Sequence, residues 1–252
     1  LSRTLRLSAL LLALSFAPTG DARPTVLPLH SPVALATTSA TAAPQTTAQV
    51  IYDRSDEQEV ERLLNDTSLR TSLDFARRLK GRPYVAATLE VADPERLVVN
   101  LRGLDCATLV ETASALAMTR REGKRRFADY CRNLERLRYF DGHVAGYTSR
   151  LHYLSFWMAD HLRRKTIEEV VLPTNLTQPL HIDLHYMSRH AESYPMLRNH
   201  PERVREIARL ERKYSGNVGR FLPKSKVGLS RNELGAIHDG DIIAVVTRKD
   251  GL

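Results

Sequence analysis

Two cysteines are the residues of this chain best suited to nucleophilic chemistry, and one of them stands at a favourable position. Cys106 follows Asp105, a residue type that commonly caps helices, and an apolar helical pattern begins there. A helix N-terminus offers unpaired backbone N–H groups and the positive end of the helix dipole, which both favour a thiolate. The position therefore predicts a nucleophilic Cys106 with a depressed pKa.

The other cysteine, Cys131, leaves an alternative open. In an oxidising compartment Cys106 and Cys131 could form a disulfide, which would remove the nucleophile. Asp105 also has two interpretations, as a plain helix cap or as a substrate contact.

Histidines are the natural bases for a cysteine nucleophile, and His152 is the one we expect near the start of a helix over residues 149–162. His181 and His185 flank Asp183 at a spacing that a metal site could use together with His190. Further ligands in register cannot be identified, so we expect no metal and no cofactor.

The elements that must position these residues are predicted by hydrophobic periodicity. Helices come first and strands later, which favours the α+β class. One helix is expected to bury Phe127, Tyr130, Cys131, Leu134 and Leu137. The helices are expected at residues 56–64, 68–79, 105–119, 124–138, 149–162 and 200–215, and the strands at 97–101, 174–187 and 237–247.

The first residues have the pattern of an export signal. Two arginines precede the apolar run from Leu7 to Ala17, and small residues follow up to Ala22. The run is shorter than the roughly 20 residues that span a bilayer, so no stable membrane span is expected after signal removal. We predict a signal peptide over residues 1–22, a flexible linker over 23–50 and one domain over 51–252, in an exported protein of the periplasm or cell envelope.

The formal net charge is +8. On an exported protein this charge suits anionic envelope polymers better than nucleic acid, so no nucleic-acid partner is expected. The oligomeric state cannot be deduced from the sequence.

Five segments, in one consistent order, resemble the papain-like NlpC-type cysteine hydrolases of bacterial cell walls, and more narrowly their N-acetylmuramoyl-L-alanine amidase-like branch. These segments are Gly81-Arg-Pro-Tyr84, Leu104-Asp-Cys106-Ala-Thr108, Ser149-Arg-Leu-His152-Tyr153, Phe221-Leu-Pro-Lys224 and Gly240-Asp241-Ile-Ile-Ala244. The resemblance implies a papain-like α+β fold in which N-terminal helices pack on an antiparallel sheet.

The resemblance also implies roles for individual residues. Cys106 would attack an amide carbonyl of peptidoglycan to form an acyl-enzyme, and Tyr84 would help bind the developing oxyanion. Asp105 would contact the free amine of a stem peptide. We expect His152 to serve at the catalytic site and Arg150 to contact substrate.

The histidine that serves as general base in the family has no counterpart in the expected place of this sequence. In the family a Ser-His-Val-Gly-type stretch, which carries the general base, follows the Gly-Asp-Ile-Ile strand, whereas this sequence ends at Leu252. We therefore expect a chain truncated at its C-terminus, with little or no turnover of muropeptides. The alternative is a peptidoglycan-binding pseudoenzyme or an envelope scaffold.

Overall fold

The computed structural model describes residues 5–13, 50–226 and 234–246. They fall into two compact units, and residues 50–150 form the first of them, here called the helical unit. The described part of the second, the mixed unit, comprises residues 5–13, 151–226 and 234–246. The predicted linker 23–50 lies outside the described residues except for Val50. Both units together contain helices and small sheets, which confirms the predicted α+β class.

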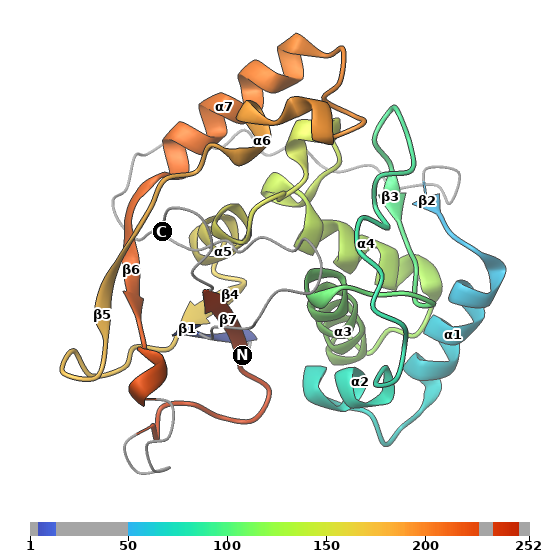
Figure 1. The fold of residues 1–252 in the computed structure, drawn as a ribbon. Helices are drawn as coiled ribbons and strands as arrows, with labels where there is room; N and C mark the ends of the chain where they lie inside the picture. The colour runs from blue at the N-terminus through green and yellow to red at the C-terminus, as the bar shows by residue number, and fades with distance from the viewer. Residues whose placement is uncertain (1–4, 14–49, 227–233, 247–252) are drawn as a thin grey trace. The chain divides into compact units, whose positions relative to one another are not determined.

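Four helices and a short parallel strand pair make up most of the helical unit (Figure 1). Its elements are β2 (Val50–Ile51), α1 (Arg54–Asn65), α2 (Ser72–Arg78), β3 (Leu97–Val98), α3 (Cys106–Arg121) and α4 (Phe127–Arg138), followed by the short helices η2 (Phe140–Gly142) and η3 (Tyr147–Ser149). Helix α3 packs against α1, α2 and α4, and β2 pairs with β3. Ten of the sixteen α3 residues are buried.

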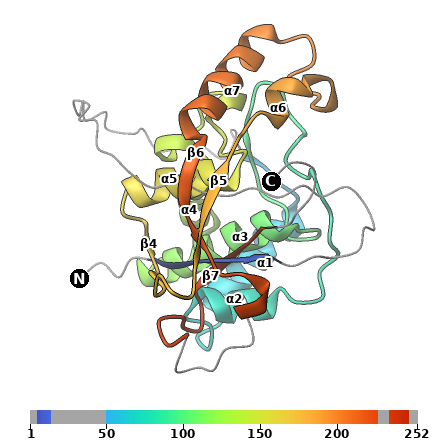
Figure 2. The ribbon, with the colours of Figure 1, turned by 60° about the vertical axis from the view of Figure 1, so that its left-hand side comes forward.

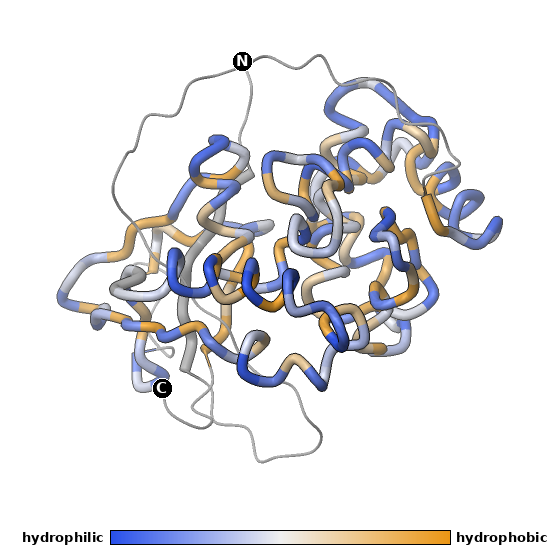
Figure 3. The backbone as a smooth tube through the Cα atoms, turned by 90° about the horizontal axis from the view of Figure 1, so that it is seen from above, coloured by the Kyte–Doolittle hydropathy of each residue, from blue (hydrophilic) through white to orange (hydrophobic). Residues whose placement is uncertain are grey.

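The core of the helical unit follows the predicted amphipathic pattern most closely in α4. All five side chains expected to face inward from this helix, Phe127, Tyr130, Cys131, Leu134 and Leu137, are buried. Figure 3 shows the corresponding alternation of hydrophobic and hydrophilic residues along the helices. Burial of one face in this way is what stabilises a helix whose other face is charged.

Helix α2 begins later than the predicted residue 68. Asp66 accepts a hydrogen bond from the backbone N–H of Ser68, which holds a turn there, and Thr71 then caps the helix through the N–H of Asp74. Local side-chain bonds of this kind compete with helix formation.

The mixed unit holds longer strands and three more α-helices. Its elements are β1 (Leu5–Ala13), α5 (Leu154–Arg163), β4 (Ile167–Glu169), β5 (Gln178–Ile182), α6 (Tyr186–Arg189), η4 (Ala191–Ser193), α7 (Pro201–Tyr214), β6 (Gly216–Phe221), η5 (Lys224–Lys226) and β7 (Ile242–Val246). Strands β5 and β6 form an antiparallel pair that runs side by side towards α6 and α7 (Figure 2).

The sheets differ from the single antiparallel sheet that the family resemblance implied. Among the strands of the described residues only β5 and β6 pair antiparallel, whereas β4, β1 and β7 form a three-stranded parallel sheet. Parallel pairing joins strands that are far apart in the chain, so alternation within one strand does not reveal it. The predicted signal segment 1–22 contributes β1 to this sheet, and its removal on export stays a prediction.

Helix α5 begins at Leu154 rather than at the predicted residue 149. Ser149 ends the short helix η3, and Arg150 has an extended backbone. No helix among the described residues is long and apolar enough to cross a membrane.

Candidate active site

Cys106 is the first residue of α3, as predicted. Asp105 caps this helix: its Oδ1 accepts a 2.8 Å hydrogen bond from the N–H of Thr108, and Thr108 Oγ1 accepts one of 2.9 Å from the N–H of Asp105. This reciprocal capping box fixes the start of the helix. Both cysteines are free thiols, Cys106 exposed and Cys131 buried, so the structure does not contain the alternative disulfide.

The loop that leads into α3 is held by two side-chain acceptors. Asn100 Oδ1 accepts from the N–H groups of Arg102 and Gly103, at 3.0 and 3.3 Å. Asp56, which is 1% exposed, accepts a 2.9 Å bond from the N–H of Leu101. Helix α1 thereby fixes the backbone a few residues before the nucleophile.

Tyr84 lies beside this loop because the two backbones are paired. The N–H of Leu104 donates to Pro83 O at 3.1 Å, and the N–H of Val85 donates to Leu104 O at 3.2 Å. The approach is close: a Cβ on Gly103 would lie 2.7 Å from Cγ2 of Val85. A glycine at position 103 therefore permits the pairing that brings Tyr84 next to Asp105 and Cys106.

The electrostatics of the site contradict the depressed cysteine pKa that the sequence suggested. The Cys106 side chain is exposed at the surface, but the protein atoms packed around it remove water and raise the pKa of its thiol. The neighbouring Asp105 carboxylate raises this pKa further, while the N–H groups of Ala107 and Cys106 lower it less. Desolvation also raises the pKa of Tyr84, and the charges on Cys106 and Asp105 add to this effect. At neutral pH the pair is therefore a thiol and a phenol that can donate a proton, and the thiol needs a base.

Arg150 lies in the interior of the helical unit, although we expected it to contact substrate. It is 4% exposed and forms ion pairs with Glu90 and, at 3.4 Å, with Glu95. Glu95 also accepts a 2.9 Å hydrogen bond from the Tyr139 hydroxyl. Because this guanidinium is buried and paired with two carboxylates, we assign Arg150 to positioning the segment 90–95, and a contact with substrate stays a prediction.

His152 belongs to the mixed unit, where it precedes the N-cap residue Tyr153 of α5 instead of lying within the helix. Its side chain is half-buried. Its role as a base stays a prediction.

The histidines of the segment 181–190 do not assemble a metal site. His185 Nδ1 lies 3.2 Å from Asp183 Oδ2, but the described residues contain no group of three or more His, Cys, Asp or Glu side chains that could hold a metal ion.

Sequence reasoning missed the residues that position the nucleophile loop, namely Asp56, Asn100 and Gly103. A local signal existed for Asn100, because an asparagine two or three residues before a glycine is typical of a turn. Asp56 had none, because its partner Leu101 lies 45 residues further along the chain.

Comparisons with known proteins place the chain in a family. Residues 74–252 match the AmiA-like family, described as N-acetylmuramoyl-L-alanine amidase-like. A structure of an N-acetylmuramoyl-L-alanine amidase from Bacteroides uniformis ATCC 8492 is 35% identical, with a TM-score of 0.59 over 67% of this chain and 69% of that one. A second structure of an amidase so described, from the same organism, is 33% identical, with a TM-score of 0.56 over 67% and 70% of the two chains.

A Bacteroides fragilis protein described as a xylanase is 40% identical, with a TM-score of 0.58 over 66% of this chain and 71% of that one. Among curated proteins none matches. The family match covers more than half of the sequence, and the chain therefore belongs to the AmiA-like, N-acetylmuramoyl-L-alanine amidase-like family.

Proposed function

We propose that this chain is an exported cysteine amidase of the papain-like NlpC type that acts on peptidoglycan, at the amide between a muramoyl group and L-alanine. The observation that carries the proposal is the exposed Cys106 at the capped start of α3, with Tyr84 held beside it. The family assignment supports the substrate class.

In the proposed reaction Cys106 Sγ loses its proton to a base and attacks the amide carbonyl carbon. The C–N bond then breaks, the amine leaves with a proton from the same base, and a thioester to Sγ remains. Water hydrolyses the thioester, which restores the thiol and releases the carboxylic acid. Tyr84, kept protonated by its surroundings, donates a hydrogen bond to the oxyanion.

Asp105 is the second polar group at this position. Its Oδ1 is occupied by the cap, so a contact with the stem-peptide amine would use Oδ2. In a muramoyl-L-alanine substrate the alanine nitrogen belongs to the scissile amide, so this contact would form with the alanine amine that cleavage releases. Only a separate cationic group on the stem peptide would offset the negative charge that raises the pKa of Cys106. Among the described histidines, His152 is our candidate for the base.

The proposal is tested by incubating the purified chain with a muramoyl-L-alanine peptide and following release of the free amine. The sequence alone predicts little or no turnover, but a base supplied by His152 would give turnover in the parent chain, with a thioester at Cys106 detected by mass spectrometry. This turnover should be abolished in Cys106→Ser. If His152 is the base, His152→Ala lowers kcat by about 10²–10⁴-fold. Turnover that survives Cys106→Ser would refute the cysteine mechanism.

The raised pKa of Cys106 favours a second candidate, a peptidoglycan-binding protein without turnover. In that case the chain binds purified cell walls, Cys106→Ala binds as well as the parent, and no amine is released.

A further inference from the structure

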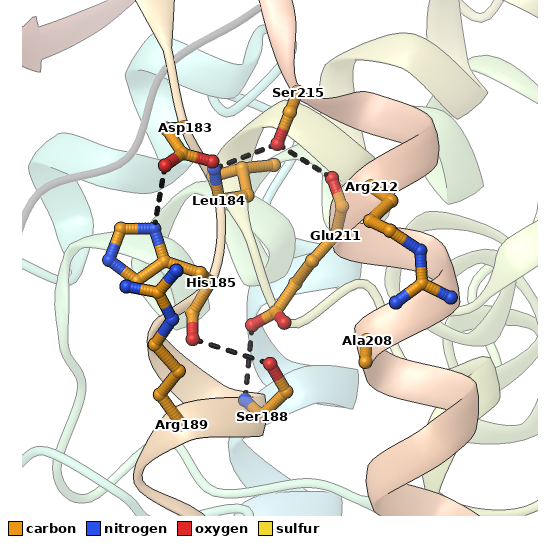
Figure 4. A pocket seen from close by; sticks show the side chains of 9 residues that line it. All are labelled: Asp183, Leu184, His185, Ser188, Arg189, Ala208, Glu211, Arg212 and Ser215. Carbon is orange, nitrogen blue, oxygen red and sulfur yellow. Dashed lines mark hydrogen bonds and ion pairs between the residues drawn. The ribbon is translucent and has the colours of Figure 1, made fainter.

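A cavity of about 350 Å³ lies in the mixed unit, between the end of β5, helix α6 and helix α7 (Figure 4). Its volume falls within the range of small-molecule sites, roughly 300–1,000 Å³. The residues that line it all lie between positions 183 and 215, and none of them belongs to the amidase machinery proposed above.

Glu211 provides a buried negative charge at this cavity. The residue is 1% exposed, and its Oε1 accepts hydrogen bonds from the Tyr153 hydroxyl at 2.6 Å and from the N–H of Ser188 at 3.2 Å. Within the described residues its Oε2 receives no hydrogen bond, and no cation pairs with the carboxylate. A buried carboxylate with only neutral donors is costly, and a cationic ligand would offset that cost.

Two arginines provide positive charge at the same cavity. Arg189 of α6 and Arg212 of α7 are both exposed, and neither guanidinium group forms an ion pair or a hydrogen bond within the part of the chain that the structure describes. Figure 4 shows them on opposite sides of the cavity with the Glu211 side chain between them. A guanidinium with free donors is well suited to bind a carboxylate.

The combination of charges selects the ligand. A simple anion would have to lie close to Glu211, and a simple cation would have to lie between two guanidinium groups. A group with both charges satisfies all three residues. We propose that this cavity binds a zwitterionic ligand, an amino acid or the free end of a peptide, with its ammonium group at Glu211 and its carboxylate at Arg189 and Arg212.

The acidic residue at the rim does not change this assignment. Asp183 is exposed and faces His185, whose Nδ1 lies 3.2 Å from its Oδ2. The Ser215 hydroxyl is also engaged, because it donates to Glu211 O at 2.8 Å and accepts from the N–H of Leu184 at 2.8 Å. Asp183 therefore lies at the solvent-exposed rim beside His185, and the charged side chains inside the cavity are those of Glu211, Arg189 and Arg212.

The test is titration calorimetry of the full chain with three probes: L-alanine, acetate and methylammonium. We expect L-alanine to bind at least ten-fold more tightly than either singly charged probe. In Glu211→Gln the amide oxygen can still accept from Tyr153 and Ser188, so the fold is retained while the charge is lost. We expect this variant to bind L-alanine at least ten-fold more weakly.

Arg212→Gln gives a second test at an exposed residue, whose replacement should leave the fold intact. We expect this variant also to bind L-alanine at least ten-fold more weakly than the parent. Arg205→Gln is the matched control, because Arg205 is an exposed arginine on the same helix that does not line the cavity. Its affinity for L-alanine should equal that of the parent. Acetate that binds as tightly as L-alanine, no binding of L-alanine, or an equal loss in Arg205→Gln would each overturn the proposal.

Discussion

Replacement of Gly103 by alanine tests how the site is positioned. The new Cβ would lie 2.7 Å from Cγ2 and 3.1 Å from Cβ of Val85. The backbone of Gly103 is outside the left-handed region, so alanine is not excluded there by its own conformation. The close approach is therefore the main cost, and it should separate the paired segments 83–85 and 103–104.

The expected loss of stability in Gly103→Ala follows from this close approach to Val85. Forcing a methyl group into a packed position costs about 1–3 kcal/mol, which corresponds to a melting temperature lower by about 2–4 °C per kcal/mol in a protein of this size. Because the same pairing holds Tyr84 beside Cys106, the proposed amidase activity should fall together with stability. Urea unfolding and amine release measure the two effects.

Val85→Ala provides the matched background for this measurement. Val85 is 42% exposed, so its truncation alone should cost little, and it removes the Cγ2 atom that the new methyl group would meet. Gly103→Ala should therefore be milder in the Val85→Ala background, with a coupling energy of about 0.5–3 kcal/mol. An equal cost in both backgrounds would show that the close approach is not what requires glycine.

Three further predictions concern charge. Asp105→Asn keeps a good helix cap but removes a negative charge that raises the pKa of Cys106. Alkylation of the Cys106 thiol by iodoacetamide at pH 8 should therefore become about three-fold faster. An unchanged alkylation rate would contradict this prediction. Arg138→Met leaves Glu111 buried without its 2.7 Å partner and should cost about 3–5 kcal/mol in urea unfolding, most of which a second change, Glu111→Met, should restore. Burial raises the pKa of Glu95, so stability should fall as the pH rises through and just above the ordinary range of glutamate pKa values. Glu95→Gln should flatten the dependence of the melting temperature on pH in that range. An unaltered dependence in this variant would show that Glu95 is not its source.

Local patterns in the sequence predicted much of the helical unit. The five inward residues of α4 and the cap at Asp105 follow from periodicity and side-chain chemistry within one turn or two, and the structure confirms both. The predicted helix bounds were less accurate where a turn precedes the helix. The short helix η3 and the extended backbone of Arg150 move the start of α5 from the predicted residue 149 to Leu154.

The buried charges could not be predicted in the same way. Arg138 and Arg150 are 3% and 4% exposed, yet in the sequence they look like ordinary surface residues. Arg138 reaches Glu111 across 27 positions and Arg150 reaches Glu90 across 60. Burial of an arginine depends on a carboxylate that the fold brings from elsewhere, and no local pattern encodes that partner.

The position of Cys106 shows why a local rule can give the right geometry and the wrong electrostatics. The helix terminus does act on the thiol, because the N–H groups of Ala107 and Cys106 lower its pKa. The atoms around the sulfur remove water from it, and Asp105, the residue that caps this terminus, places a negative charge next to it. Both effects oppose the thiolate and outweigh the helix, whose dipole contributes only about 0.3–1 kcal/mol at an exposed site. Activation of Cys106 therefore has to come from a base or from the charge of a bound substrate.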